Sequence, residues 1–429
     1  MARLDAFFHK MAELQCSDLH LTTGLAPYFR LHGEMVAVTG VQAWDAEETK
    51  RVLYEITPVA NQAEFDRDHD TDFAYELPGR ARFRCNLFMD HRGPGGVFRL
   101  IPNDILTCEQ LGLPKAVRDL CFLSKGLVLI TGPTGSGKST TLAAMVDHIN
   151  KTRSDHIITI EDPIEFVHHS QKCLVHQREV GRHTGSFKRA LRAALREDPD
   201  IVLVGEMRDL ETVSIAVETA ETGHLVFGTV HTTTAMNTVD RLVDQFPSDR
   251  QAQIRTMLAA SLKGVVAQTL CKKKPKGRVA ALEVLIGSKA VSALIREGKT
   301  HQLQSQMQMG AKTGMRLLND SLLELVQKNL VDPAEAYLRA VDKESLLSQF
   351  QHANIHLDLA ALGDVSEIGS APELARAPAS APAPAATAHP HPAAPFPTPA
   401  AGPAPASAPR KPTGATDATF EEFRKKRGY

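Results

Sequence analysis

The stretch GPTGSGKST, residues 132–140, combines the residue types that bind a phosphate group. It lies between an apolar run at 127–131 and a helical pattern, which predicts a strand, a glycine-rich turn and a helix. Glycines let backbone N–H groups face an anion, and the start of the helix adds its positive dipole end. In this spacing Lys138 would reach the β/γ-phosphates and Ser139 would ligate Mg²⁺. An ordinary glycine-rich turn would not need the complete spacing, so we expect nucleotide binding. The predicted binding residues are Gly132, Pro133, Thr134, Gly135, Ser136, Gly137, Lys138, Ser139 and Thr140.

Acidic residues follow two other predicted strands. Glu161 comes directly after the apolar run 156–160, and Glu206 follows the run 201–204. A carboxylate at a strand end that faces a phosphate loop can hold Mg²⁺ through its waters or orient an attacking water. Asp162 precedes Pro163, so a helix-capping role is as well supported for it as a catalytic one. Glu161 and Glu206 are therefore the better candidates for chemistry and for the metal.

Two histidines bracket one apolar strand. His224 and His231 flank the run 225–230, and we expect both ends of that strand to meet the nucleotide face. Most of the 18 histidines have the ordinary interpretation of packed or surface residues.

Four arginines gather in the first hundred residues. They are Arg82, Arg84, Arg92 and Arg99. Arg82 and Arg84 are two apart on a predicted strand and so face the same side. One interpretation is a solvated sheet face. The other is a set of cations presented to the γ-phosphate held by a neighbouring subunit, which requires an oligomer.

Length and composition limit the class of protein. A chain of 429 residues exceeds one typical core, so two folded domains and tails are expected. The formal net charge of −1 argues against bulk nucleic-acid binding. The six cysteines form no C-x-x-C pair, which disfavours a zinc site or a disulfide framework and favours reduced thiols in the cytoplasm. No apolar run approaches the roughly 20 residues of a membrane span.

The pattern along the chain predicts an α/β protein with five parts. Residues 1–101 form a small mixed α/β domain that begins with a helix at 3–14, and 102–115 are a linker. In 116–288, short apolar runs alternate with helical patterns, as in a parallel sheet. Residues 289–362 are helical, and 363–429 are a disordered Pro/Ala-rich tail with a short charged end.

Several motifs in this order resemble the secretion ATPases of type IV pilus and type II secretion machines, and most closely the pilus retraction ATPases. The resemblance covers about residues 1–360. Its marks are SDLHLTTG at 17–24, ARFRCNLF at 81–88, the Walker A loop at 132–140, EDPIEF at 161–166 as the Asp box, ALREDPDIVLVGEMRD at 194–209 as Walker B and TGHLVFGTVHTT at 222–233 as the His box.

The resemblance implies an N-terminal PAS-like domain joined to a RecA-like ATPase domain in a homo-hexameric ring. It implies ATP and Mg²⁺ as cofactors and Glu206 as the residue that activates water. It also implies that Glu161 assists in binding the metal or in positioning the water. His224 and His231 match the His box, and the arginines match the family's arginine-rich strand region. The implied partner is an inner-membrane pilus platform protein, with a paralogous retraction ATPase as a further one. The protein would then be cytoplasmic and peripherally associated with the inner membrane.

Two departures bear on the direction of the motor. Extension and type II secretion relatives usually carry a tetracysteine zinc element, which this chain lacks, and this favours retraction. The segment AVSALIRE at 290–297 places Ser292 where retraction ATPases have an arginine, which keeps an accessory retraction paralogue as an alternative. A related secretion-system ATPase that drives another filament is a further alternative within the class, and a nucleotide-gated scaffold is the alternative from another class.

Overall fold

The computed structural model describes residues 2–14, 16–31, 34–38, 40–101 and 104–357. The predicted tail at 363–429 and the end of the predicted helical region lie outside the described residues. The described residues belong to one compact unit. Within the described part of the chain, no helix has the length and apolar character needed to cross a bilayer.

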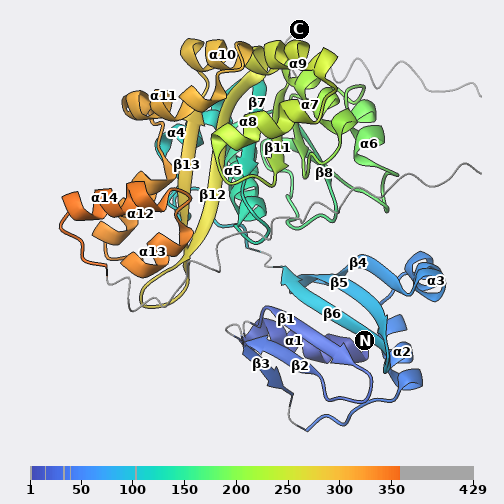
Figure 1. Cartoon of the computed structure of the whole chain (residues 1–429). Coiled ribbons are helices and arrows are strands. Elements are labelled where there is room, and N and C mark those ends of the chain that lie inside the picture. The colour runs from blue at the N-terminus through green and yellow to red at the C-terminus, as the bar shows by residue number, and fades with distance from the viewer. Residues whose placement is uncertain (1, 15, 32–33, 39, 102–103, 358–429) are drawn as a thin grey trace, which may run out of the picture. The chain divides into compact units, whose positions relative to one another are not determined.

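Residues before the linker form a six-stranded antiparallel sheet with the order β3-β2-β1-β6-β5-β4 (Figure 1). Its strands are β1 (Asp18–Thr22), β2 (Tyr28–Leu31), β3 (Glu34–Ala37), β4 (Asp70–Leu77), β5 (Ala81–Asp90) and β6 (Gly93–Ile101). Its helices are α1 (Arg3–Leu14), α2 (Ala46–Tyr54) and α3 (Val59–Asp68). The expected helix at 3–14 is confirmed, whereas β4 was not predicted although Phe73, Tyr75 and Leu77 alternate along it.

Strand β5 shows why this sheet has one apolar and one polar face. Phe83 and Cys85 are fully buried, whereas Arg82 and Arg84, which alternate with them, are half-buried. Successive side chains of a strand point to opposite faces, so the two arginines share the polar face, as predicted. Phe8 of α1 stacks on Phe83 with ring centroids 4.2 Å apart and closes the apolar face.

The second sheet has seven strands in the order β13-β12-β7-β11-β10-β8-β9 (Figure 1). Its strands are β7 (Gly126–Thr131), β8 (His156–Glu161), β9 (Leu174–Glu179), β10 (Ile201–Val204), β11 (Leu225–Val230), β12 (Leu262–Lys272) and β13 (Arg278–Ile286). All neighbouring pairs are parallel except β12 and β13. The predicted parallel sheet is confirmed, but three of its strands were not predicted: β9, β12 and the antiparallel edge strand β13.

Helices cover both faces of this sheet and extend beyond it. They are α4 (Lys115–Asp119), α5 (Lys138–Thr152), α6 (Phe187–Ala194), α7 (Leu210–Thr222), α8 (Ala235–Asp244), α9 (Ser248–Ser261), α10 (Lys289–Arg296), α11 (Leu303–Met309), α12 (Leu318–Gln327), α13 (Pro333–Arg339) and α14 (Lys343–His352). Along β7, Leu127 and Leu129 pack in the core under α7 to α9, whereas Val128 and Ile130 pack under α5. The sheet is therefore buried on both faces, as parallel sheets require. Helices α12 to α14 pack in a separate cluster beside Cys271 of β12 and Ala281 of β13.

We predict that Phe8→Ala lowers the free energy of unfolding by about 3–5 kcal/mol, because it removes a fully buried ring and leaves a cavity. Urea denaturation followed by circular dichroism measures this change. The control is Phe7→Ala, which removes a partly exposed ring that makes an edge contact with Trp44. An equal loss in both variants would contradict the packing that we describe.

Candidate functional site

The predicted phosphate loop connects the end of β7 to the start of α5. Gly137 precedes the helix with φ 88°, and Gly132 has φ 145°, conformations that favour glycine. A Cβ atom on Gly132 would lie 2.3 Å from the carbonyl oxygen of Gln268. The loop therefore needs glycine both for its backbone angles and for its close contact with β12.

Two buried hydroxyl groups at this loop lack a partner among the described residues. They are Oγ1 of Thr131 and Oγ of Ser136. Buried polar atoms are normally hydrogen-bonded, so such groups mark a place for a polar ligand. With the glycine cradle and the start of α5, these hydroxyls fit a phosphate-bearing ligand.

The Lys138 ammonium group is held by the loop itself. It donates to the carbonyl oxygens of Gly132 and Pro133 at 2.8 and 3.1 Å. Burial lowers the pKa of Lys138, and the charges of Glu206 and Glu165 oppose that change. The lysine is thus a nearly buried cation whose partners are neutral carbonyls, and a phosphate would be a stronger one.

His231 connects Lys138 to Glu206. Its Nδ1 lies 3.4 Å from the Lys138 Nζ, and its Nε2 lies 2.8 Å from Oε1 of Glu206. A lysine only donates and a carboxylate only accepts, so these contacts assign the neutral tautomer with the proton on Nε2. Arg208 also pairs with Glu206. Four side chains therefore contact one another in series. We call them the charge relay row: Lys138, His231, Glu206 and Arg208.

Glu161 lies at the carboxyl end of β8. It accepts hydrogen bonds from the Thr159 hydroxyl at 2.6 Å and the Gln177 side-chain amide at 3.2 Å. Burial raises the pKa of Glu161 to about 7. This carboxyl group changes its charge near neutral pH, where a nearby divalent cation would favour the charged form.

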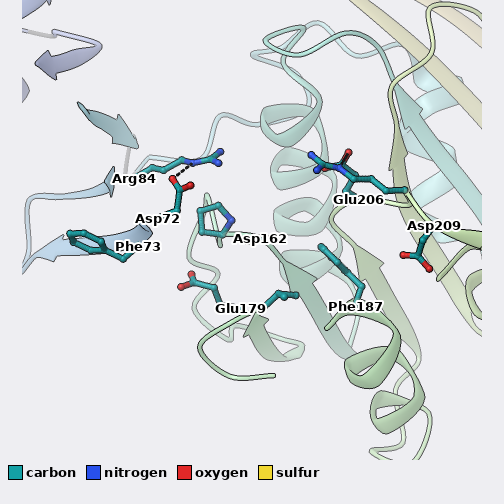
Figure 2. Close-up of a pocket in the computed structure, with 11 residues that line it drawn as sticks. Asp72, Phe73, Arg84, Asp162, Glu179, Phe187, Glu206 and Asp209 are labelled. Atoms are coloured by element: carbon teal, nitrogen blue, oxygen red, sulfur yellow. Dashed lines mark hydrogen bonds and ion pairs between the residues drawn. The ribbon is translucent and has the colours of Figure 1, made fainter. Parts of the chain in front are cut away.

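A pocket of about 350 Å³ lies beside Glu206. Figure 2 shows Glu206, Asp162 and Arg84 around it, with Arg84 paired to Asp72. No helix begins at Asp162, since the next described helix after it is α6, so the capping interpretation of Asp162 is wrong. Asp209 instead caps α7 through the Thr212 N–H at 2.9 Å.

The two histidines lie at opposite ends of β11. His224 precedes the strand, and its Nδ1 contacts the carbonyl oxygen of Thr219 at 3.1 Å, at the end of α7. The six residues of β11 pair in register with β7, whose carboxyl end leads into the phosphate loop. The expectation that both histidines meet the nucleotide face is therefore wrong for His224, because a strand of six residues spans about 20 Å.

The four arginines are not brought to the phosphate loop by contacts within the chain. Arg82 pairs with the buried Glu179 at 3.0 Å, and Arg99 pairs with Asp18 at 2.9 Å. Arg84 lines the pocket beside Glu206, and the Arg92 backbone N–H donates to Asp90 at 2.7 Å. Of these four arginines, Arg84 is thus the one that lines the pocket beside Glu206.

Sequence reasoning missed Gln268, which is nearly fully buried behind the loop. Its side-chain amide N–H donates to the carbonyl oxygen of Ser136 at 2.6 Å, and its Oε1 accepts from the Thr141 hydroxyl at 2.8 Å. It therefore ties the loop and the first turn of α5 to β12. No local signal pointed to Gln268, because its partners lie more than a hundred residues away along the chain.

We predict that Gln268→Leu weakens ATP binding at least tenfold, since it leaves a buried carbonyl and hydroxyl unpaired at about 1–3 kcal/mol each. Titration with a fluorescent ATP analogue measures the Kd, and a thermal melt checks the fold. Thr141→Val, which removes one of the two bonds, should give a smaller loss. An unchanged Kd in a folded Gln268→Leu protein would rule out this role.

Comparison with known proteins gives consistent matches. The family described as "Type II/IV secretion system protein" matches residues 3–275. The chain is 51% identical over 329 residues to "Type IV pilus retractation ATPase PilT" of Pseudomonas aeruginosa, covering 77% of this chain and 95% of the relative. It is 38% identical over 331 residues to "Type IV pilus ATPase PilU" of the same species, covering 77% and 86%. A structure described as the pilus retraction motor PilT with bound ADP superposes with a TM-score of 0.76 at 43% identity, covering 81% of this chain and 99% of that one.

Proposed function

This chain belongs to the Type II/IV secretion system protein family, and we propose that it is the ATP-hydrolysing motor that retracts type IV pili. The observation that carries the proposal is the charge relay row, which joins the phosphate loop to the carboxylate after β10. The 51% identity to a pilus retraction ATPase supports the choice of pilus retraction among the family's activities.

The loop residues 132–140 would hold the phosphates of ATP. Lys138 would exchange its two carbonyl partners for phosphate oxygens, which form stronger, charge-assisted hydrogen bonds. Ser139, Glu161 and Glu206 would hold Mg²⁺, partly through water. That cation would neutralise the negative charge that develops on the transferred phosphoryl group.

Glu206 would act as the base that orients the attacking water. The His231 N–H and the Arg208 guanidinium hold its carboxylate in place. When Lys138 moves toward a phosphate, His231 loses one of its two partners, so the arrangement around Glu206 responds to the nucleotide. This gives the motor a direct link between nucleotide binding and the catalytic carboxylate.

We also propose a homo-hexamer in which the first-domain arginines complete a neighbour's site. Among the described residues, no hydrogen bond or ion pair joins these four arginines to the phosphate loop of their own chain, and they carry the cations that phosphoryl transfer requires: Arg82, Arg84, Arg92 and Arg99. Such a ring would act at the cytoplasmic face of the inner membrane, on a pilus platform protein.

One observation favours an accessory role similar to that of PilU as the second candidate. Ser292 stands where the retraction ATPases have an arginine, and its hydroxyl donates to the Ala259 carbonyl at 2.6 Å. The lower identity of 38% to PilU makes this the weaker candidate.

We predict that Glu206→Gln binds ATP with nearly unchanged affinity but hydrolyses it at least 100-fold more slowly, because the base is lost and the loop is intact. Lys138→Ala should instead lose ATP binding. Phosphate release and a fluorescent ATP analogue measure the two effects. Hydrolysis at the wild-type rate by Glu206→Gln would refute the assignment.

We predict that the ATPase rate falls as the pH drops through about 7, because Glu161 has a raised pKa and is uncharged below it. Bound Mg²⁺ favours the charged carboxylate, so the midpoint should lie at or somewhat below that pH. A pH profile of kcat/KM measures it. The Glu161→Gln variant should be slower and lack this acidic limb, and an identical limb in both proteins would contradict the prediction.

A further inference from the structure

A basic pocket of about 490 Å³ lies at the end of the second sheet that is remote from the phosphate loop. Its cations are Lys263, Lys289 and Arg296, and none of its lining residues is acidic. Strands β12 and β7 run parallel, with Leu262 beside Leu127 at one end and Ala267 beside Thr131 at the other. The pocket is thus at the amino ends of these strands, and the phosphate loop is at the carboxyl end.

Lys263 is held in a defined position. The register between β12 and β7 shifts at this residue, and such bulges re-aim side chains. Its stem lies over Gly126, where a Cβ atom would come within 2.3 Å of the lysine Cγ. Its ammonium group donates to the carbonyl oxygen of Ala260 at 3.1 Å. The bulge and this bond therefore place the ammonium group of Lys263 beside the end of α9.

Helix α10 supplies the other two cations. Lys289, Ser292 and Arg296 are spaced i, i+3, i+7 and share one helix face. The Ser292 hydroxyl bond to Ala259 fastens α10 to α9, and Figure 1 shows the two helices side by side. Glu297, the acidic residue next to Arg296, pairs with Lys299 at 2.8 Å. The basic face therefore stays available to an outside anion.

The size and lining of the pocket favour a peptide. Ala259 and Leu262 give it an apolar part, and its volume accommodates several side chains. A flat anionic membrane gains only about 1 kcal/mol for each lysine or arginine near its surface, so three cations alone would hold it weakly. We propose that this pocket binds an acidic peptide segment of a partner protein in the pilus machine. The identity of the machine rests on the proposed function, whereas the acidic character of the ligand rests on the pocket.

The binding test uses a fluorescein-labelled octaglutamate peptide and the full chain. We expect the triple variant Lys263→Glu, Lys289→Glu, Arg296→Glu to bind it at least tenfold more weakly, and added salt to weaken wild-type binding. The matched control reverses the charge of three other exposed lysines, in Lys172→Glu, Lys273→Glu, Lys312→Glu, and it should bind within twofold of the wild type. Octaglutamine should not bind.

Three results would overturn the proposal. The first is equal loss of octaglutamate binding in the triple and control variants. The second is full competition by millimolar inorganic phosphate, which would indicate a simple anion site. The third is loss of binding to phosphatidylserine vesicles, but not to the peptide, in the triple variant. If the triple variant fails to fold, Lys289→Glu and Arg296→Glu replace it, because both side chains are exposed.

A test in cells separates this proposal from the proposed function. The triple variant should keep its ATPase rate within twofold and yet lose pilus retraction, because its substitutions are remote from the nucleotide. Retraction by this variant would overturn the pocket's role and leave the motor function intact. Retraction by a Lys138→Ala strain that lacks any second retraction ATPase would instead refute the motor function.

Discussion

The contact between the phosphate loop and strand β12 is the constraint on which the rest of the site depends. Gly132 and Gly137 adopt positive φ angles and press against Gln268, which binds Ser136 and Thr141 in turn. Only a strand directly beside β7 can make this contact, so the position of β12 in the sheet defines the shape of the loop. The loop is thereby preorganised before a nucleotide binds, which lowers the entropic cost of binding.

The charge relay row builds on that fixed loop. Its members come from the segments that follow β7, β10 and β11, which are adjacent through the strand order β7-β11-β10. His231 is central because a neutral imidazole can accept from Lys138 and donate to Glu206 at once. One side chain therefore connects the phosphate loop to the carboxylate of Glu206.

Strand β12 also separates the two proposed tasks of the motor. Gln268 lies beside the phosphate loop, and Lys263 lies five positions earlier, about 16 Å away in an extended strand. Chemistry and partner binding then use opposite ends of one rigid element. The cations of the basic pocket are therefore separate from the residues of the phosphate loop.

The sequence by itself determined the local elements: the strand, loop and helix around 126–152, and the alternation along β5 that puts Arg82 and Arg84 on one face. These follow from residue type and spacing over a few neighbours. The tertiary structure alone decided that Gln268 supports the loop, that His231 rather than His224 joins the site, and that Lys263 meets α10. The physical reason is that these contacts join atoms far apart in the chain. Strand order and strand direction bring them together, and neither is encoded in a local pattern.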